Sequence, residues 1–119
     1  MVLQRLVAIG KSLLLKKANK SDIDMLFGKK IRELRDENGV MQRQLAALLE
    51  IDTPMFSKIE RGDRRAKREQ VIKLAEYFNQ NENEMLTLWL AGKVLDAVDG
   101  EQELSSQAIE VAQEQIREL

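Results

Sequence analysis

Apolar residues recur three and four positions apart along most of the chain from Met25 onward, which is the spacing of helices that bury one face. Phe27, Ile31 and Leu34 form the first such stripe. Asn38-Gly39 then marks the end of a helix, because both residues tolerate left-handed backbone. The alternation of apolar and polar residues that indicates a strand is not found in the sequence. The pattern therefore predicts an all-helical (all-α) fold.

Five further helices are predicted after this first one, each bounded by residues that begin or end helices. A short helix is expected over residues 42–49. Asp52 is a good N-cap and Pro54 suits a first helical turn, so a third helix is expected to run from there to about Arg61, with Gly62 closing it. The remaining helices are expected over about residues 67–78, from about Asn83 onward, and over residues 102–119 after the Asp99-Gly100 break.

The charged residues are segregated along the chain, although the formal net charge of the whole sequence is only −1. Residues 1–24 and residues 25–80 each carry a net charge of +3, whereas residues 81–119 carry −7. The most basic stretch, residues 61–68, holds five cations and one acid. Such a run is usually a solvated surface. A basic front and an acidic tail are also expected, however, when one region meets phosphate and another stays away from it.

The sequence contains no histidine and no cysteine, so an enzymatic function is less expected. Histidine is the side chain most used for acid–base catalysis near neutral pH, and no pair of carboxylates or glycine-rich phosphate loop replaces it. Without cysteine there is no disulfide framework and no thiolate metal site, and a reducing compartment is natural. We therefore expect a cytoplasmic protein that is not an enzyme and binds no cofactor and no metal.

Residues 1–24 contain short apolar runs that are interrupted by Gly10 and Lys11. No small-residue cleavage site follows, so a secretory signal is not indicated. No run approaches the roughly 18–20 apolar residues that a membrane-spanning helix needs, and no membrane partner is expected. Three alternatives remain open for this basic extension: an amphipathic helix that docks on another part of the protein, a loosely held arm, or a basic arm that touches DNA.

Two short helices separated by about three residues are the core of a helix-turn-helix, and residues 39–62 resemble the lambda-repressor-like (Xre) family of such regulators. Ala46 is the small residue that lets the two helices cross closely, and residues 57–62, Ser-Lys-Ile-Glu-Arg-Gly, match the family's usual end of the recognition helix. The resemblance covers about residues 25–90. Apolar residues stand at the family's core positions Leu45, Leu49, Ile51, Phe56 and Ile59.

This resemblance implies a five-helix lambda-repressor-like DNA-binding domain, here with an additional C-terminal helix. We assign residues 25–80 to the helix-turn-helix domain and residues 81–119 to a C-terminal helical segment. Residues 66–71 and 86–90 are also similar to small regulators found near restriction–modification genes. Two positions depart from the family pattern. Glu50 replaces the usual turn glycine, at modest strain, and Met41 replaces a Ser or Thr cap worth about 1 kcal/mol.

The resemblance also implies which residues contact DNA. The first residues of the recognition helix face base edges in the major groove, and those candidates are Thr53, Pro54, Met55, Ser57 and Lys58. For Met55, partial packing against the second helix is as much expected as a base contact. Phosphate contacts are expected from the start of the second helix and from the basic run: Gln42, Arg61, Arg64, Arg65, Lys67 and Arg68. In the family an arginine of the first helix pairs with a glutamate at the end of the third, which implies a structural ion pair between Arg35 and Glu60.

One recognition helix covers few base pairs, so two copies are expected to bind a two-fold site in double-stranded DNA. The apolar residues after residue 84 exceed what one helix can bury against a small domain. They predict a homodimer interface together with Leu104, Val111 and Ile116, unless the last helix folds back to complete the core of the monomer. The expected function is a sequence-specific transcriptional regulator, a homodimeric repressor or controller. The alternative is an antitoxin or adaptor whose C-terminal helices bind a partner protein.

Overall fold

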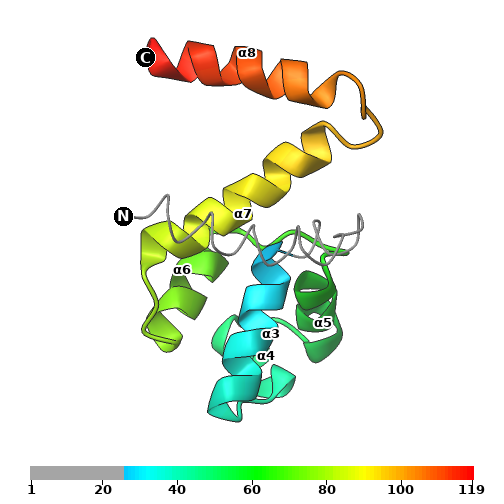
Figure 1. Cartoon of the computed structure of the whole chain (residues 1–119). Coiled ribbons are helices and arrows are strands. Elements are labelled where there is room, and N and C mark those ends of the chain that lie inside the picture. The colour runs from blue at the N-terminus through cyan, green and yellow to red at the C-terminus, as the bar shows by residue number, and fades with distance from the viewer. Residues whose placement is uncertain (1–25) are drawn as a thin grey trace.

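The computed structural model describes residues 26–119, which form six α-helices and no strand (Figure 1). In chain order these are α3 (Leu26–Asn38), α4 (Gln42–Leu48), α5 (Thr53–Arg61), α6 (Arg68–Tyr77), α7 (Glu82–Ala97) and α8 (Ser105–Arg117). The prediction of an all-helical fold with an additional C-terminal helix is confirmed. The three alternatives for residues 1–24 concern a part of the chain outside the described residues.

The ends of α5 are formed by the residues that the sequence indicated. The Asp52 carboxylate accepts a hydrogen bond from the Met55 amide at 2.7 Å, Pro54 lies in the first turn, and Gly62 ends the helix in left-handed backbone with φ of 83°. Glu50, the turn residue at which the resemblance implies glycine, also adopts left-handed backbone, with φ of 57°. Non-glycine residues seldom adopt this conformation, so the packing around the turn before α5 must impose it.

The N-terminus of α4 is capped without help from the side chain of its N-cap residue. Met41 offers no side-chain hydrogen bond there. Instead the Gln44 side-chain oxygen accepts a hydrogen bond from the Met41 backbone amide at 2.7 Å. This bond satisfies the amide of the residue that precedes the helix, which offsets part of the missing cap.

The hydrophobic core is formed by α3, α4, α5, α6 and the first half of α7 (Figure 1). The largest side chains that it buries completely are Phe56, Ile31, Leu45, Leu74, Met85 and Val71. Two of these six side chains come from α6 and one from each of the other four helices, and burying each contributes on the order of 1.5–3 kcal/mol. The core continues past residue 80, the boundary expected between the domain and the C-terminal segment.

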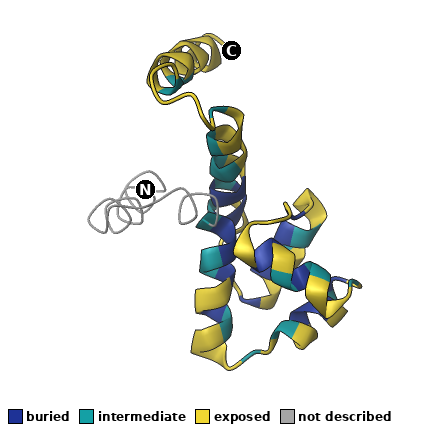
Figure 2. Ribbon diagram, turned by 90° about the vertical axis from the view of Figure 1, so that its right-hand side faces the viewer, coloured by how far each residue is buried: buried dark blue, intermediate teal, exposed yellow. Residues whose placement is uncertain are grey.

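The C-terminal part of the molecule leaves this core. The first half of α7 buries Met85, Leu86, Leu88 and Trp89, whereas its second half and α8 are mostly exposed (Figure 2). No residue of α8 is buried. The last helix therefore does not fold back to complete the core. None of the helices in residues 26–119 is long and apolar enough to span a bilayer.

Candidate nucleic-acid interface

Helices α4 and α5 form a helix-turn-helix unit whose contact is apolar and close. Leu45 and Ala46 are buried in α4, and Phe56 and Ile59 are buried in α5. The Ile51 amide in the intervening turn donates a hydrogen bond to the Ala46 carbonyl at 3.0 Å. These contacts fix the angle of α5 relative to α4, and they leave the opposite side of α5 facing solvent.

The solvent-facing side of α5 carries a stripe of polar side chains. Thr53, Pro54, Lys58 and Arg61 are exposed and Ser57 is half-buried, while Phe56, Ile59 and Glu60 point inward. Helical geometry explains this division, because positions i, i+4, i+5 and i+8 share one side of a helix. A helix with its side chains is about 10–12 Å wide, so α5 fits a major groove about 12 Å wide. Of the expected base-reading residues, the structure places all except Met55 on this stripe.

Met55 is half-buried on the side of α5 next to the stripe. Its backbone amide is engaged by the Asp52 cap. The structure therefore gives this side chain a share in packing, which was one of the two roles considered for it.

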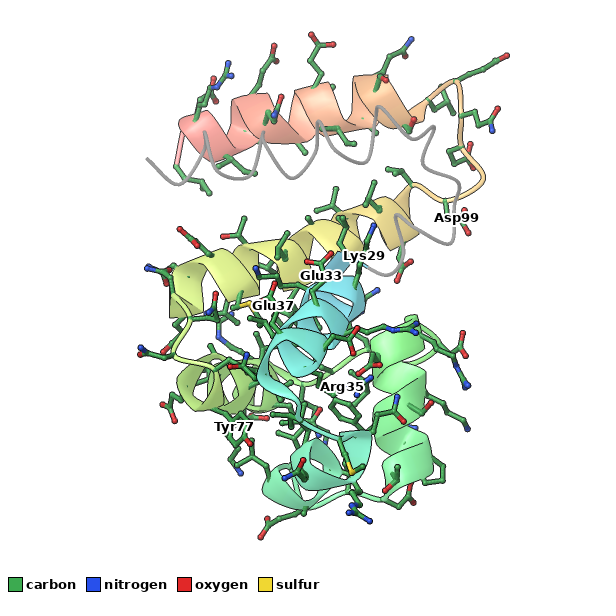
Figure 3. All side chains as sticks on the ribbon, turned by 60° about the horizontal axis from the view of Figure 1, so that its bottom comes forward. Lys29, Glu33, Arg35, Glu37, Tyr77 and Asp99 are labelled. Atoms are coloured by element: carbon green, nitrogen blue, oxygen red, sulfur yellow. The ribbon has the colours of Figure 1, made fainter. Side chains whose placement is uncertain are left out.

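The inward side of α5 is held by a bidentate ion pair between Arg35 and Glu60. The Arg35 Nε donates to Glu60 Oε2 at 2.8 Å, and its Nη2 donates to Glu60 Oε1 at 2.8 Å. Glu60 is buried, with 5% of its side chain exposed. These hydrogen bonds raise the pKa of Arg35, so the guanidinium stays charged. In Figure 3 Arg35 points from α3 toward α4 and α5, whereas Lys29, Glu33 and Glu37 lie in a row along another side of α3.

Two more hydrogen bonds complete this network. The Arg35 Nη1 donates to the Val40 carbonyl at 3.2 Å, and the Gln42 Nε2 donates to Glu60 Oε1 at 3.2 Å. Gln42 was expected to contact phosphate. In the structure its side-chain amide donates to the Glu60 carboxylate and so supports α5. The carboxylate thus ties together α3, α4 and α5.

Helices α3 and α5 approach closely at Gly28. A Cβ atom placed at this residue would lie 2.1 Å from the Glu60 carbonyl oxygen. No side chain fits there, because the obstructing atom belongs to the backbone and cannot rotate away. The sequence analysis did not single out Gly28. A glycine inside a predicted helix was the available signal, because such a residue costs about 1 kcal/mol of helix propensity unless packing requires it.

The cations of residues 61–68 differ in their ion pairs. Arg64, Lys67 and Arg68 are exposed and form no ion pair with any of residues 26–119. Arg61 pairs with Asp63 at 3.2 Å, with both side chains more than half exposed, so this contact can be exchanged for phosphate.

Arg65 differs from these cations in its partner, although it was also expected to contact phosphate. Its guanidinium is hydrogen-bonded to the Asp96 carboxylate of α7. The partner is 31 residues further along the chain, so no local pattern could have indicated it. Arg65 in the structure therefore contacts α7 through an ion pair on the surface.

Trp89 holds the loop that follows α5. Its indole Nε1 donates to the Ala66 carbonyl at 2.8 Å, and Ala66 is itself buried against the core. The Lys93 ammonium lies 4.0 Å from the centre of the Trp89 ring, a cation–π contact. Sequence reasoning counted Trp89 only as an apolar residue. A buried indole N–H needs an acceptor, and that requirement was the signal for a polar role.

Arg43 is a further exposed cation that the sequence analysis did not include. It lies in the first turn of α4, the helix whose N-terminus stands beside the recognition helix in a helix-turn-helix. Helix N-termini attract phosphate through their free amide groups, and a cation there adds to the attraction.

The comparison with protein families matches residues 28–89 to the Helix-turn-helix domain. This match covers more than half of the chain and includes α4, α5 and the first half of α7. The comparisons with curated proteins and with solved structures found no match. The matched residues are those that build the core and present the polar stripe of α5. The chain therefore belongs to the Helix-turn-helix domain family and carries a DNA-binding domain of that kind.

Proposed function

We propose that the protein is a transcriptional regulator that binds double-stranded DNA at specific sequences and reads the major groove with α5. The observation that carries this proposal is the division of α5. One side is fixed to α3 and α4 by buried apolar contacts and the Arg35–Glu60 pair, and the other side offers uncharged polar groups and cations to solvent. A recognition helix needs such a rigid seat, since base contacts depend on its position in the groove.

Within this proposal Thr53 and Lys58 read bases. Thr53 can exchange a hydrogen bond with a base edge or touch a thymine methyl group, and Lys58 can reach guanine O6 and N7. Pro54 and Ser57 complete the contact surface. Each such base contact is worth about 1–3 kcal/mol of discrimination.

Phosphate contacts in the proposal come from the end of the recognition helix, from the residues that follow it and from the start of α4. Arg61 ends α5, Arg64, Lys67 and Arg68 follow it, and Arg43 lies in the first turn of α4. Gln42 and Arg65 contribute less, because their donor groups already face Glu60 and Asp96. With about four to six phosphates neutralised by each copy, the affinity falls steeply with salt.

The proposal includes two copies on an inverted repeat, acting as a repressor or controller of the lambda-repressor-like type. The copies can be joined through the exposed apolar side chains of α7 and α8 or by the DNA alone. One observation favours a second candidate, the antitoxin or adaptor. The C-terminal helices expose large apolar side chains that a partner protein could cover.

The test is a selection of bound sequences from random duplex DNA, followed by anisotropy on the selected site and on a scrambled site. Lys58→Ala and Thr53→Ala should each lower the ratio of the two affinities by about 10- to 100-fold, as the loss of one base contact predicts. Lys73→Ala is the matched control, because Lys73 is an exposed lysine on α6, outside the proposed contact surface. An inverted repeat among the selected sequences supports two copies. If no sequence is enriched, the adaptor becomes the better candidate.

A further inference from the structure

A pocket lies between the beginning of α3, the end of α5, the loop that follows α5, and α7. Its volume is about 290 Å³, at the lower end of the range of small-molecule sites. The large apolar side chains that line it are buried, namely Phe27, Ile59, Leu88 and Trp89. The charged side chains that line it are exposed and come from the loop and from α7. Apolar walls with a few polar groups are typical of a site that binds a small molecule.

Gly92 leaves part of the pocket wall without a side chain. This residue lies within α7, where glycine is an unfavourable helix former. Close packing does not require it, because among residues 26–119 a Cβ atom there would meet only the Arg65 Nη1, at 3.4 Å. Gly28, which also lines the pocket, differs in this respect, since its Cβ would collide with the Glu60 carbonyl. A use for the open wall explains Gly92, because backbone without a Cβ lets a ligand approach closely.

The charged side chains of the pocket include one cation that is available to a ligand. Arg65 is paired with Asp96, and Asp63 is paired with Arg61, which is not a lining residue. Arg64 is exposed and forms no ion pair with any of residues 26–119. A guanidinium group binds a carboxylate through two parallel hydrogen bonds. The pocket therefore favours a ligand that joins an apolar body to a carboxylate.

We propose that this pocket binds a small carboxylic acid with an aromatic or branched aliphatic body. The body packs against Trp89 and the other buried apolar side chains, beside Gly92. The carboxylate binds the Arg64 guanidinium. The small volume excludes larger ligands such as nucleotides, and the two aspartates already have arginine partners, so a cationic ligand is not favoured.

Binding of this ligand has a consequence for DNA. The proposed function gives Arg64 a phosphate contact, and one guanidinium cannot serve a ligand carboxylate and a phosphate at full strength. The ligand is therefore an effector that lowers the affinity for DNA, and DNA lowers the affinity for the ligand by the same factor. This consequence rests on the proposed function, whereas the binding of the ligand does not.

A titration of the full chain, followed by its amide signals in two-dimensional NMR spectra, tests ligand binding. The probes are phenylacetate, benzoate and isovalerate. At least one of them should shift the amides of Gly28, Ala66 and Gly92 in a saturable manner, with half-saturation at about 1 mM or below. The neutral amide of the same probe should bind at least about tenfold more weakly, because it cannot form the ion pair with Arg64.

Gly92→Leu tests the location of the site. Its side chain fills the pocket, so the saturable shifts should be lost. Ala97→Leu is the matched control, because it places the same side chain at an exposed position of α7 outside the pocket lining and should leave the shifts unchanged. Leucine is a better helix former than glycine, and an unfolding temperature at or above that of the unaltered protein verifies that Gly92→Leu is folded.

Arg64→Gln tests the charge of the ligand. It should weaken binding of the carboxylate probe by about tenfold and leave binding of the neutral amide unchanged. Arg117→Gln on α8 is the matched control, because it removes the same group from an exposed position that does not line the pocket. In anisotropy, a saturating concentration of the probe should lower the affinity for the selected DNA site by about fivefold or more.

Three results would overturn the site. No saturable shift with any of the three carboxylates would mean that the pocket does not bind this class of ligand. Shifts that persist in Gly92→Leu would place the binding elsewhere on the surface. Equal affinity for a carboxylate and its amide would exclude the ion pair with Arg64. Saturable shifts without any effect on DNA affinity would refute the effector role alone, and saturable shifts in a protein that selects no DNA sequence would refute the proposed function while the site stands.

Discussion

The Glu60 carboxylate is the residue on which the position of the recognition helix depends. It accepts hydrogen bonds from Arg35 on α3 and from Gln42 on α4, and it is nearly inaccessible to solvent. A buried carboxylate with these partners is stable, but the same group without its cation is strongly unfavourable. Removing one residue of the network alone is therefore expected to lower the free energy of unfolding more than replacing the whole network does.

Arg35→Met should lower the free energy of unfolding by about 3 kcal/mol, because it leaves Glu60 buried without its cation. The double substitution Arg35→Met/Glu60→Leu should cost less than Arg35→Met alone, since no unpaired charge remains. Urea unfolding of both variants measures these differences. If the two costs simply add, the ion pair does not have the coupling that its geometry indicates.

At the scale of the elements, the close crossing of α3 and α5 depends on the absence of a side chain at Gly28. The Glu60 carbonyl occupies the space that a Cβ would need. Any larger residue must push the two helices apart, and the shift would be passed to the polar stripe of α5. The packing of α3 and α5 and the proposed DNA contact are thus linked through one position that carries no functional group.

Gly28→Ala should destabilise the protein by about 3 kcal/mol or more, although alanine is the better helix former. Gly92→Ala on α7 is the control, because its Cβ would meet only the flexible Arg65 side chain at 3.4 Å. That variant should be neutral or more stable by up to about 1 kcal/mol. Thermal unfolding of both distinguishes a packing effect from a propensity effect. Equal stability of the two variants would contradict the close approach.

Much of the element structure was predictable from sequence because its causes are local. The apolar spacing of Phe27, Ile31 and Leu34 indicates a helix wherever it occurs, and Asp52 and Gly62 act on the turn next to them. The contacts Arg65–Asp96 and Trp89–Ala66 were not predictable, because they join residues 31 and 23 positions apart. Periodicity assigns a residue to a face but does not say which other face it meets. For the same reason, the sequence left open whether α8 would fold back onto the core.

At the scale of the whole molecule, the structure separates a cationic end from an acidic end. Arg43, Arg64, Lys67 and Arg68 are exposed around α5, while the acids of α8 lie at the far end of α7 (Figure 1). This arrangement orients the molecule in the field of a phosphate backbone before any contact forms. We therefore expect the salt dependence of DNA binding to come from these few cations rather than from the net charge of −1.

Arg68→Ala should weaken binding to all DNA sequences alike and reduce the slope of log affinity against log salt by about one, as the loss of one phosphate contact requires. Arg65→Ala should leave that slope nearly unchanged, because its guanidinium already faces Asp96. Anisotropy at several salt concentrations measures both slopes. Should Arg65→Ala reduce the slope as much as Arg68→Ala, the contact with Asp96 is given up when DNA binds.

The attachment of Trp89 to the Ala66 carbonyl gives the protein an optical reporter. Trp89 is the only tryptophan in the chain, so its fluorescence comes from one known site. The indole is hydrogen-bonded to the backbone between Arg65 and Lys67, in the loop that follows the recognition helix. Emission wavelength and intensity respond to that hydrogen bond and to the nearby Lys93 charge. The seating of the loop can therefore be followed in unlabelled protein, during unfolding or while DNA is added.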